Sequence, residues 1–387
     1  MRQLLANARK HESQMVRLLG RFVRAESPST DKAAVDRFGR LVAAEWRRRG
    51  ARVRILRQRA CGNHVRAELF LGHGRPRGQI LVLGHLDTVY DVGTLERTPF
   101  RIARGRAWGP GTFDMKSGLV IALFAADALR RAGLRPSRRL VFLWTSDEEI
   151  GSESSRAIIE REARQSDAVL VLEPADGPRG NLKTARKGVG EVVLVVHGRA
   201  AHAGLNPEDG VNAVHELALQ VARLMRLNNP RRGITVNANV IEGGTRTNVI
   251  AERAQARVDL RVTRKADIPK LERLIRSVRP VLKGARLEVR GGIGRPPMEQ
   301  RMARALFQRA KELARRMGFE LRESFVGGGS DGNFTAALGV PTLDGLGAVG
   351  AGAHSSHENV VIRALSERAA LLAGLLLSER RLRGVAK

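Results

Sequence analysis

The sequence has little cysteine and few aromatic residues. Cys61 is the only cysteine among 387 residues, so no intramolecular disulfide can form, which fits a reducing cytoplasm. Aromatic residues make up 4%, too few for a base-stacking surface. No run of 18 or more apolar residues occurs, and the N-terminal segment lacks the apolar core of a secretory signal. We therefore expect a cytoplasmic protein without a membrane partner.

Acidic residues are few beside the basic ones. There are 39 acidic and 68 basic residues, and the formal net charge is +29. Only ten of the basic residues are lysines, and the arginines are scattered along the chain without a basic tail. We expect no specific nucleic-acid partner. Binding of nucleic acid stays a hypothesis that rests on charge alone, and tight, salt-sensitive DNA binding would support it.

Hydrophobic residues make up 43% of the chain, enough for a sizeable core in two or three domains. Helix-like and strand-like segments alternate in the first half, which predicts an α/β architecture. Continuous apolar runs predict buried strands at 79–83, 139–144 and 168–172. Apolar periodicity predicts helices at 2–24, 32–49 and 115–132.

The pattern changes near residue 188. Between 188 and 292 the segments follow the order strand, helix, strand, strand, helix, strand, which is typical of a split βαβ, ferredoxin-like α+β unit. Helical periodicity then returns at 299–317 and 363–382. We predict one α/β domain, residues 1–187 and 293–387, interrupted by an inserted domain at 188–292.

Polar strings follow the predicted buried strands. In open α/β sheets, ligands bind at this edge. The candidate residues are His85 and Asp87 after the first strand, Asp114 before the core helix, Glu148 and Glu149 after the second strand, Glu173 after the third, and His354 and His357 in a late glycine-rich loop.

Histidine nitrogens mixed with carboxylate oxygens suit zinc, manganese or cobalt. Asp87 could orient the imidazole of His85. Asp114 could bridge two cations, although, taken alone, an ordinary helix N-cap is the better explanation of an aspartate there. One of the paired glutamates could bind metal while its neighbour acts as a general base, and either late histidine could be a ligand.

The strings GHLDTV, GPGTFDMKSG, TSDEEIGS, LEP and HSSHE resemble, in this order, those of the M20 metallopeptidase family over about residues 10–380. That family includes glutamate carboxypeptidases, acetylornithine and succinyl-diaminopimelate deacylases and aminoacylases. The resemblance implies a zinc-peptidase-like catalytic domain, with a central mixed sheet flanked by helices. It also implies two Zn²⁺ ions per subunit, with Co²⁺ or Mn²⁺ as alternatives.

The resemblance also implies roles for single residues. Glu148 matches the general base and Asp87 the residue that orients His85. His354 is preferred to His357 because the family's late ligand lies about four residues before an acid, here Glu358. The matching metal ligands are His85, Asp114 as the bridge, Glu149, Glu173 and His354.

The inserted domain resembles the family's lid and dimerisation domain, which implies a homodimer. His202, in the string GRAAHAG, matches a histidine that reaches the partner subunit's active site and stabilises the oxyanion. Four further residues match substrate-binding positions: Asn248, Arg261, Arg295 as a carboxylate clamp, and Lys187 as its helper. In so arginine-rich a chain, a solvated surface arginine is a strong alternative explanation for Arg295.

We therefore expect a metal-dependent hydrolase that cleaves the amide bond of a small N-acyl amino acid or dipeptide and releases a C-terminal amino acid such as glutamate. One alternative is a deacylase acting on N-acetylornithine or succinyl-diaminopimelate, or an aminoacylase. Another is an inactive family member that only binds ligands. No expected ligand is replaced, which disfavours the inactive member.

Overall fold

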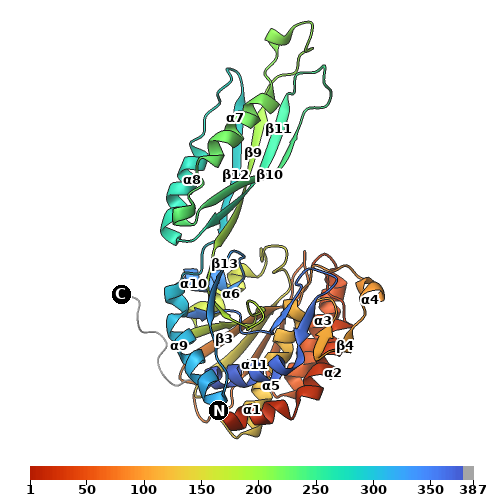
Figure 1. Cartoon of the computed structure of the whole chain (residues 1–387), viewed down its shortest axis with the longest axis vertical. Coiled ribbons are helices and arrows are strands. Elements are labelled where there is room, and N and C mark those ends of the chain that lie inside the picture. The colour runs from red at the N-terminus through yellow and green to blue at the C-terminus, as the bar shows by residue number, and fades with distance from the viewer. Residues whose placement is uncertain (378–387) are drawn as a thin grey trace. The chain divides into compact units, whose positions relative to one another are not determined.

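The computed structural model describes residues 1–377, and its backbone forms two compact units (Figure 1). Unit 1 contains residues 1–185, 300–325 and the chain from 330 onward, and unit 2 contains 186–299 and 326–329. Unit 2 extends beyond the expected 188–292 at both ends and includes a short segment from much later in the chain. No helix within residues 1–377 is both long enough and apolar enough to cross a bilayer.

A six-stranded mixed sheet forms the centre of unit 1. Its strand order is β1-β2-β6-β3-β7-β14, antiparallel from β1 to β6 and parallel from β6 to β14. The strands are β1 (Arg52–Leu56), β2 (His64–Leu69), β3 (Gln79–His85), β6 (Arg139–Thr145), β7 (Ala168–Val171) and β14 (Thr342–Leu343). Because β3, β6 and β7 are parallel neighbours, their carboxyl ends meet at one edge.

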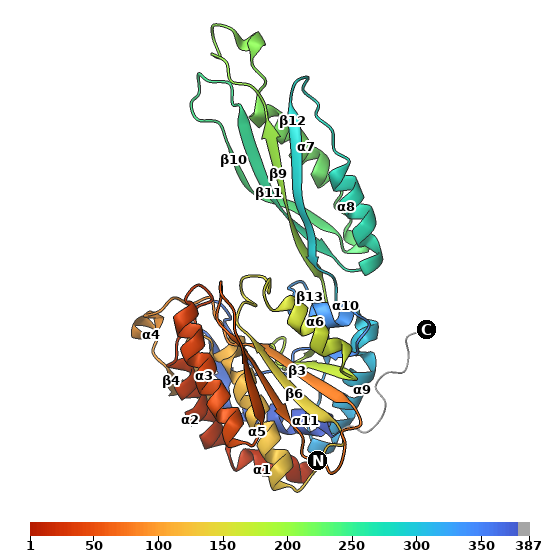
Figure 2. The ribbon, with the colours of Figure 1, turned by 180° about the vertical axis from the view of Figure 1, so that it is seen from behind.

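Helices cover both faces of this sheet, as Figures 1 and 2 show from opposite sides. On one face, alternate residues of β3, β6 and β7 pack against α6 (Arg156–Arg164) and α10 (Gly332–Ala337). On the other face, Trp46 of α3 (Lys32–Arg48) stacks on Phe142 of β6 with ring centroids 4.0 Å apart. Both faces of the central strands are therefore buried, which explains their continuous apolar sequence.

Smaller elements complete unit 1. The remaining helices are α1 (Arg2–Arg9), α2 (Glu12–Val23), α4 (Thr94–Arg97), α5 (Ser117–Arg131), α9 (Gln300–Met317) and α11 (Ile362–Leu376). A short segment, η1 (Thr112–Lys116), precedes α5 and has non-helical backbone at Asp114 and Met115. A second sheet has the order β15-β16-β5-β4, from Gly350–Ala351, Asn359–Val361, Arg106–Trp108 and Arg101–Ala103. β8 (Leu182–Arg186) pairs with β13 (Glu323–Val326).

Two terminal helices differ from the sequence-based expectation. The helix expected at 2–24 is two helices that are separated at Lys10 and His11, where His11 Nδ1 lies 2.7 Å from the carbonyl oxygen of Asn7. The helix expected at 363–382 is α11, and the expected residues 378–382 lie outside the described part of the chain.

Unit 2 is a four-stranded antiparallel sheet with two helices on one face. In chain order its elements are β9 (Gly188–His197), α7 (Ala213–Met225), β10 (Thr235–Gly243), β11 (Arg253–Val262), α8 (Ile268–Arg276) and β12 (Arg286–Arg295). The sheet order is β10-β11-β9-β12, so β10 and β12 are its edges. β12 continues well past the strand that apolar residues indicate. Gly291 allows this, with a φ of +91° and the carbonyl oxygen of Glu191 only 2.2 Å from where a Cβ would lie.

Candidate metal centre

The carboxyl ends of the parallel strands in unit 1 carry most of the candidate residues. His85 is the last residue of β3, Glu148 and Glu149 follow β6, and Glu173 follows β7. Asp114 lies in η1, directly before α5. His354 lies in the loop between β15 and β16. The strand register thus places residues from distant parts of the sequence at one edge.

Asp114 is shared between two groups of potential ligands. One of its carboxylate oxygens lies 3.2 Å from His85 Nε2, and the other lies 3.4 Å from His354 Nε2. His85 Nε2 is also 3.6 Å from Glu173, and His354 Nε2 is 3.2 Å from Glu149. Two three-residue groups with metal-ligand chemistry therefore meet at one carboxylate.

Asp87 connects His85 to the loop that follows β6. His85 Nδ1 lies 2.9 Å from the backbone carbonyl of Asp87 and 3.5 Å from its carboxylate, so the carbonyl is the nearer partner. The carboxylate accepts hydrogen bonds from the backbone N–H groups of Glu148 and Glu149, at 3.3 and 3.2 Å. The Ser29 hydroxyl donates to the same carboxylate at 2.7 Å. Asp87 is thus placed to fix the ring of His85 and the start of the glutamate loop together.

The carboxylate of Glu358 holds the backbone around Asp114. It accepts hydrogen bonds from the N–H groups of Gly111, Phe113 and Asp114 at 2.8, 2.6 and 2.8 Å, and the Tyr90 hydroxyl donates to it at 2.6 Å. Sequence reasoning used Glu358 only as a marker for His354 and overlooked Tyr90 and Ser29. The acid in HSSHE was the available signal for Glu358. Contacts this distant in sequence give no signal for the other two.

The charges around the two histidines shift their protonation equilibria. Hydrogen bonds that His354 donates to the carboxylates of Asp114 and Glu149 raise the pKa of His354 to about 10. Burial alone would lower the pKa of His85, but the carboxylates around it raise that pKa well above its usual range. Burial raises the pKa of Asp114, yet hydrogen bonds from both histidines outweigh this and lower it. Each histidine favours a positive charge here, as expected of a site that attracts cations.

The donor set fits a pair of divalent metal ions. Glu149 is raised in pKa chiefly by burial, and its Oε1 is buried without a hydrogen-bond partner in the described residues. An acceptor oxygen left in this state is what a metal ion would satisfy. The imidazole nitrogens and carboxylate oxygens together suit zinc, cobalt or manganese.

The structure distinguishes the two late histidines. His354 has a φ of +61°, uncommon outside glycine, and its ring faces Asp114 and Glu149. Within residues 1–377, His357 belongs to neither ligand group, and its Nδ1 lies 3.1 Å from the Ser355 hydroxyl.

The other candidate residues lie in unit 2 and fall into two groups: one contains His202 and Asn248, and the other contains Lys187, Arg261 and Arg295. The backbone of Ala203, next to His202, donates to the carbonyl of Asn248 at 3.0 Å. Arg261 and Arg295 both pair with Val189 on β9 from opposite sides. The Arg261 guanidinium contacts Asp259 at 2.8 Å, so part of its charge is already neutralised. Lys187 directly precedes β9. The substrate-binding roles of these residues stay predictions.

Comparisons with known proteins support the geometry. The profile of peptidase family M20/M25/M40 matches residues 81–378. Carboxypeptidase G2 from Pseudomonas sp. (strain RS-16) is 30% identical over 384 residues, covering 97% of this chain and 91% of that protein. Aminopeptidase PepT from Bacillus cereus shares the fold with a TM-score of 0.77 at 21% identity, covering 95% of this chain and 98% of that one.

A further solved structure, the YXEP protein of Bacillus subtilis, is described as a dinuclear metal binding peptidase from the M20 family. It has a TM-score of 0.71 at 15% identity and covers 95% of this chain and 98% of its own. The family profile spans most of this chain, and the curated relative spans nearly all of it. The chain therefore belongs to peptidase family M20/M25/M40 and is a metallopeptidase or related amidohydrolase.

Proposed function

We propose that this protein hydrolyses the amide bond of a small N-acyl amino acid or dipeptide and releases a C-terminal amino acid such as glutamate. The single observation that carries the proposal is the carboxylate of Asp114, shared between the His85 and His354 groups. Such sharing is the arrangement that a pair of hydrolytic metal ions requires.

Five residues would hold the metal ions, proposed to be two Zn²⁺: Asp114 between them, His85 and Glu173 on one side, and Glu149 and His354 on the other. When bound, the ions would polarise the amide carbonyl and increase the acidity of water. The dinuclear centre described for the YXEP relative supports this number of ions.

Glu148 is the proposed general base. Its backbone N–H donates a hydrogen bond to Asp87, and its neighbour Glu149 contacts His354. The backbone of Glu148 is therefore fixed beside the proposed metal ligands. Its carboxylate takes a proton from the attacking water as the new C–O bond forms. The same carboxyl group then gives the proton to the leaving amine nitrogen as the C–N bond breaks.

The two groups in unit 2 cannot both contact one small substrate within a single chain. Arg261 and Arg295 flank Val189 at one end of β9, whereas Asn248 and His202 lie beyond His197 at the other end. These ends are about 25 Å apart along the strand, and an extended dipeptide spans only about 7 Å. We propose that Lys187, Arg261 and Arg295 bind the substrate carboxylate.

His202 and Asn248 are then proposed to serve the site of a second copy, where His202 donates a hydrogen bond to the developing oxyanion. The edge strand β10 supports this homodimer. Ile241 and Val240 on β10 are 57% and 43% exposed, and Val214 and Leu219 on the adjacent α7 are exposed as well. An edge strand beside exposed apolar side chains is typical of an association surface.

Hydrolysis of a matched substrate panel tests the proposal. Zinc-loaded protein would be given N-acyl-glutamates, N-acetylornithine and N-succinyl-diaminopimelate, each with and without a chelator. Chelator-sensitive release of glutamate is the expected result. Preference for either of the other two substrates would replace the carboxypeptidase assignment with a deacylase assignment. Absence of turnover on the whole panel by metal-loaded, folded protein would contradict the proposal and favour the inactive binding protein.

A further inference from the structure

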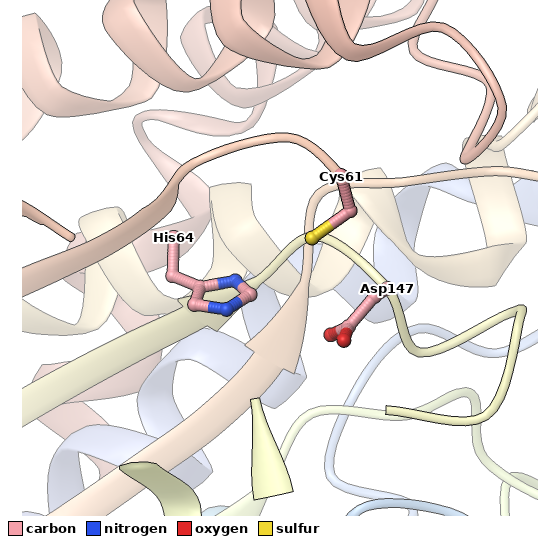
Figure 3. Close-up of side chains that lie close together, drawn as sticks. All are labelled: Cys61, His64 and Asp147. Atoms are coloured by element: carbon pink, nitrogen blue, oxygen red, sulfur yellow. The ribbon is translucent and has the colours of Figure 1, made fainter. Parts of the chain in front are cut away.

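A second cluster of potential metal ligands lies in unit 1, outside the candidate centre. Cys61 lies between β1 and β2, His64 begins β2, and Asp147 follows β6. All three side chains are buried, and one ligand atom from each lies within 4.8 Å of the other two. Figure 3 shows the thiol, the imidazole and the carboxylate turned toward one another.

The three donors are chemically suited to a zinc-type ion. A thiol sulfur, an imidazole nitrogen and a carboxylate oxygen are the ligands that zinc uses most in proteins. Burial lowers the pKa of His64, which favours the neutral imidazole that a metal needs. The Ser146 hydroxyl lies 2.8 Å from His64 Nδ1, leaving Nε2 facing the cluster, in the way that ligating histidines are oriented.

The carboxylate of Asp147 is incompletely satisfied. Its Oδ2 accepts hydrogen bonds from the Ser154 hydroxyl at 2.7 Å and from the backbone of Ser154 and Ser155 at 2.8 and 3.2 Å. Its Oδ1 is buried and has no hydrogen-bond partner among residues 1–377, although Asp147 is only 2% exposed. A buried carboxylate with an unmatched oxygen is costly unless a cation balances it.

The Ser154 hydroxyl marks the centre of the cluster. Its oxygen lies 3.0 Å from Cys61 Sγ, 3.1 Å from His64 Nε2 and 2.7 Å from Asp147 Oδ2. Zinc bonds to these atom types measure about 2.0–2.3 Å, so each ligand atom would move inward by roughly 1 Å or less. Rotation of the small serine side chain would free the position for an ion.

A hydrogen-bond network without metal is the competing explanation. The Ser154 hydroxyl has one proton to donate, yet it contacts a thiol, an imidazole nitrogen and a carboxylate. Even with the thiol and the imidazole as donors to Ser154, Asp147 Oδ1 stays without a partner. The network places no positive charge beside the buried carboxylate, whereas a cation at the position of the Ser154 hydroxyl would bind Asp147 Oδ2 and balance its charge.

We propose that Cys61, His64 and Asp147 form a further binding site for a zinc-type transition-metal ion, separate from the candidate dinuclear centre. Binding would release the thiol proton to solvent and form a bond from the thiolate to the metal. Because Asp147 directly precedes Glu148, the ion would connect the segment before β2 to the loop that carries the proposed general base. Its role is structural, since the three ligands are buried.

Cobalt substitution tests this site by spectroscopy. The full chain would be produced in cobalt-supplemented medium, so that the ion is present while the buried site forms. Cobalt bound to a thiolate gives a charge-transfer absorption band in the near ultraviolet. Because Cys61 is the only cysteine, any such band reports this site alone. We expect the band in the parent protein, and we expect Cys61→Ser to lose both the band and one metal ion per chain.

Two matched variants separate the alternatives. His354→Ala alters the candidate dinuclear centre and should keep the band, whereas loss of the band would show that Cys61 does not bind metal independently. Ser154→Ala removes the centre of the hydrogen-bond network and should also keep the band. A folded, cobalt-containing parent protein without the band would overturn the proposal. This readout does not depend on turnover, so it is independent of the proposed activity.

Discussion

The backbone N–H of Asp114 donates a hydrogen bond of 2.8 Å to the carboxylate of Glu358, which is only 1% exposed. Gly111 and Phe113 donate to the same carboxylate. Three N–H groups within four residues thus donate to the Glu358 carboxylate, which fixes the backbone of this segment. The fixed backbone in turn positions the Asp114 side chain. Glu358 is thus a positioning residue for the proposed bridging ligand.

Replacing Glu358 with glutamine should weaken metal binding by about 10–100-fold, the usual effect of losing a partner that orients a ligand. The amide would present an N–H₂ group where Glu358 Oε2 now accepts from Gly111. Competition with a chromophoric chelator measures the dissociation constants. Tyr90→Phe is the control, because it removes one hydroxyl donor and keeps all three backbone contacts, so its effect should be smaller. Parental affinity in Glu358→Gln would contradict the positioning role.

Glu148→Gln should lower kcat by about 10²–10⁴-fold, because the amide cannot accept the proton of the attacking water. Metal content should stay close to that of the parent, since Glu148 is not among the five proposed ligands. Steady-state kinetics together with elemental analysis measure both quantities. Parental turnover in this variant would show that another group is the base.

Mixed dimers test whether His202 acts in the site of a second copy. His202→Ala and Glu148→Gln are each expected to be nearly inactive alone. In a dimer that contains one chain of each, one site has an intact Glu148 and receives an intact His202 from the other chain. Equal co-expression should therefore restore about a quarter of the parent's activity per chain, since half of the dimers are mixed and one of their two sites is complete. Absence of any recovery would place His202 in its own subunit's site, and parental activity of His202→Ala alone would place it outside the chemistry.

Glu45 on α3 should contribute stability that depends on pH. Its side chain is 7% exposed and contacts Arg49 at 2.8 Å and Arg48 at 3.0 Å, and Arg21 is a further partner. Burial raises its pKa, but hydrogen bonds from Arg49 and Arg21 outweigh this and lower it. A carboxyl with a lowered folded pKa stabilises the fold above its unfolded pKa and loses this contribution as pH falls through the folded value.

Glu45→Gln should therefore reduce the free energy of unfolding by about 1–3 kcal/mol at pH 7. The difference from the parent should shrink below about pH 4.3, where glutamate in the unfolded chain becomes protonated. Denaturant titration at pH 7 and at a pH below about 4.3 measures the change. Glu160→Gln, which removes an exposed ion pair with Arg156, is the control and should change stability by less than about 1 kcal/mol at either pH. An equal loss at both pH values would contradict the ionic origin of the Glu45 effect.

The sequence alone determined the fold class and the family. Apolar runs that are followed within five residues by His85, Glu149 or Glu173 can be recognised without coordinates, because a strand buried on both faces needs continuous apolar side chains. The loop after such a strand does not need them. Local pattern was less informative at α1 and α2, where one periodic segment is two helices separated at Lys10 and His11. It also missed the extension of β12 to Arg295, since this strand passes through three glycines, Gly291, Gly292 and Gly294.

Only the tertiary structure decided how these groups meet. The sharing of Asp114 between His85 and His354 cannot be derived from local pattern alone, because His354 lies more than 200 residues after Asp114. Local pattern also gives no signal that Glu358 accepts a hydrogen bond from Asp114, or that Cys61 and His64 lie beside Asp147. Periodicity records which side of an element is buried, whereas side-chain contacts between distant segments depend on packing that no local pattern encodes.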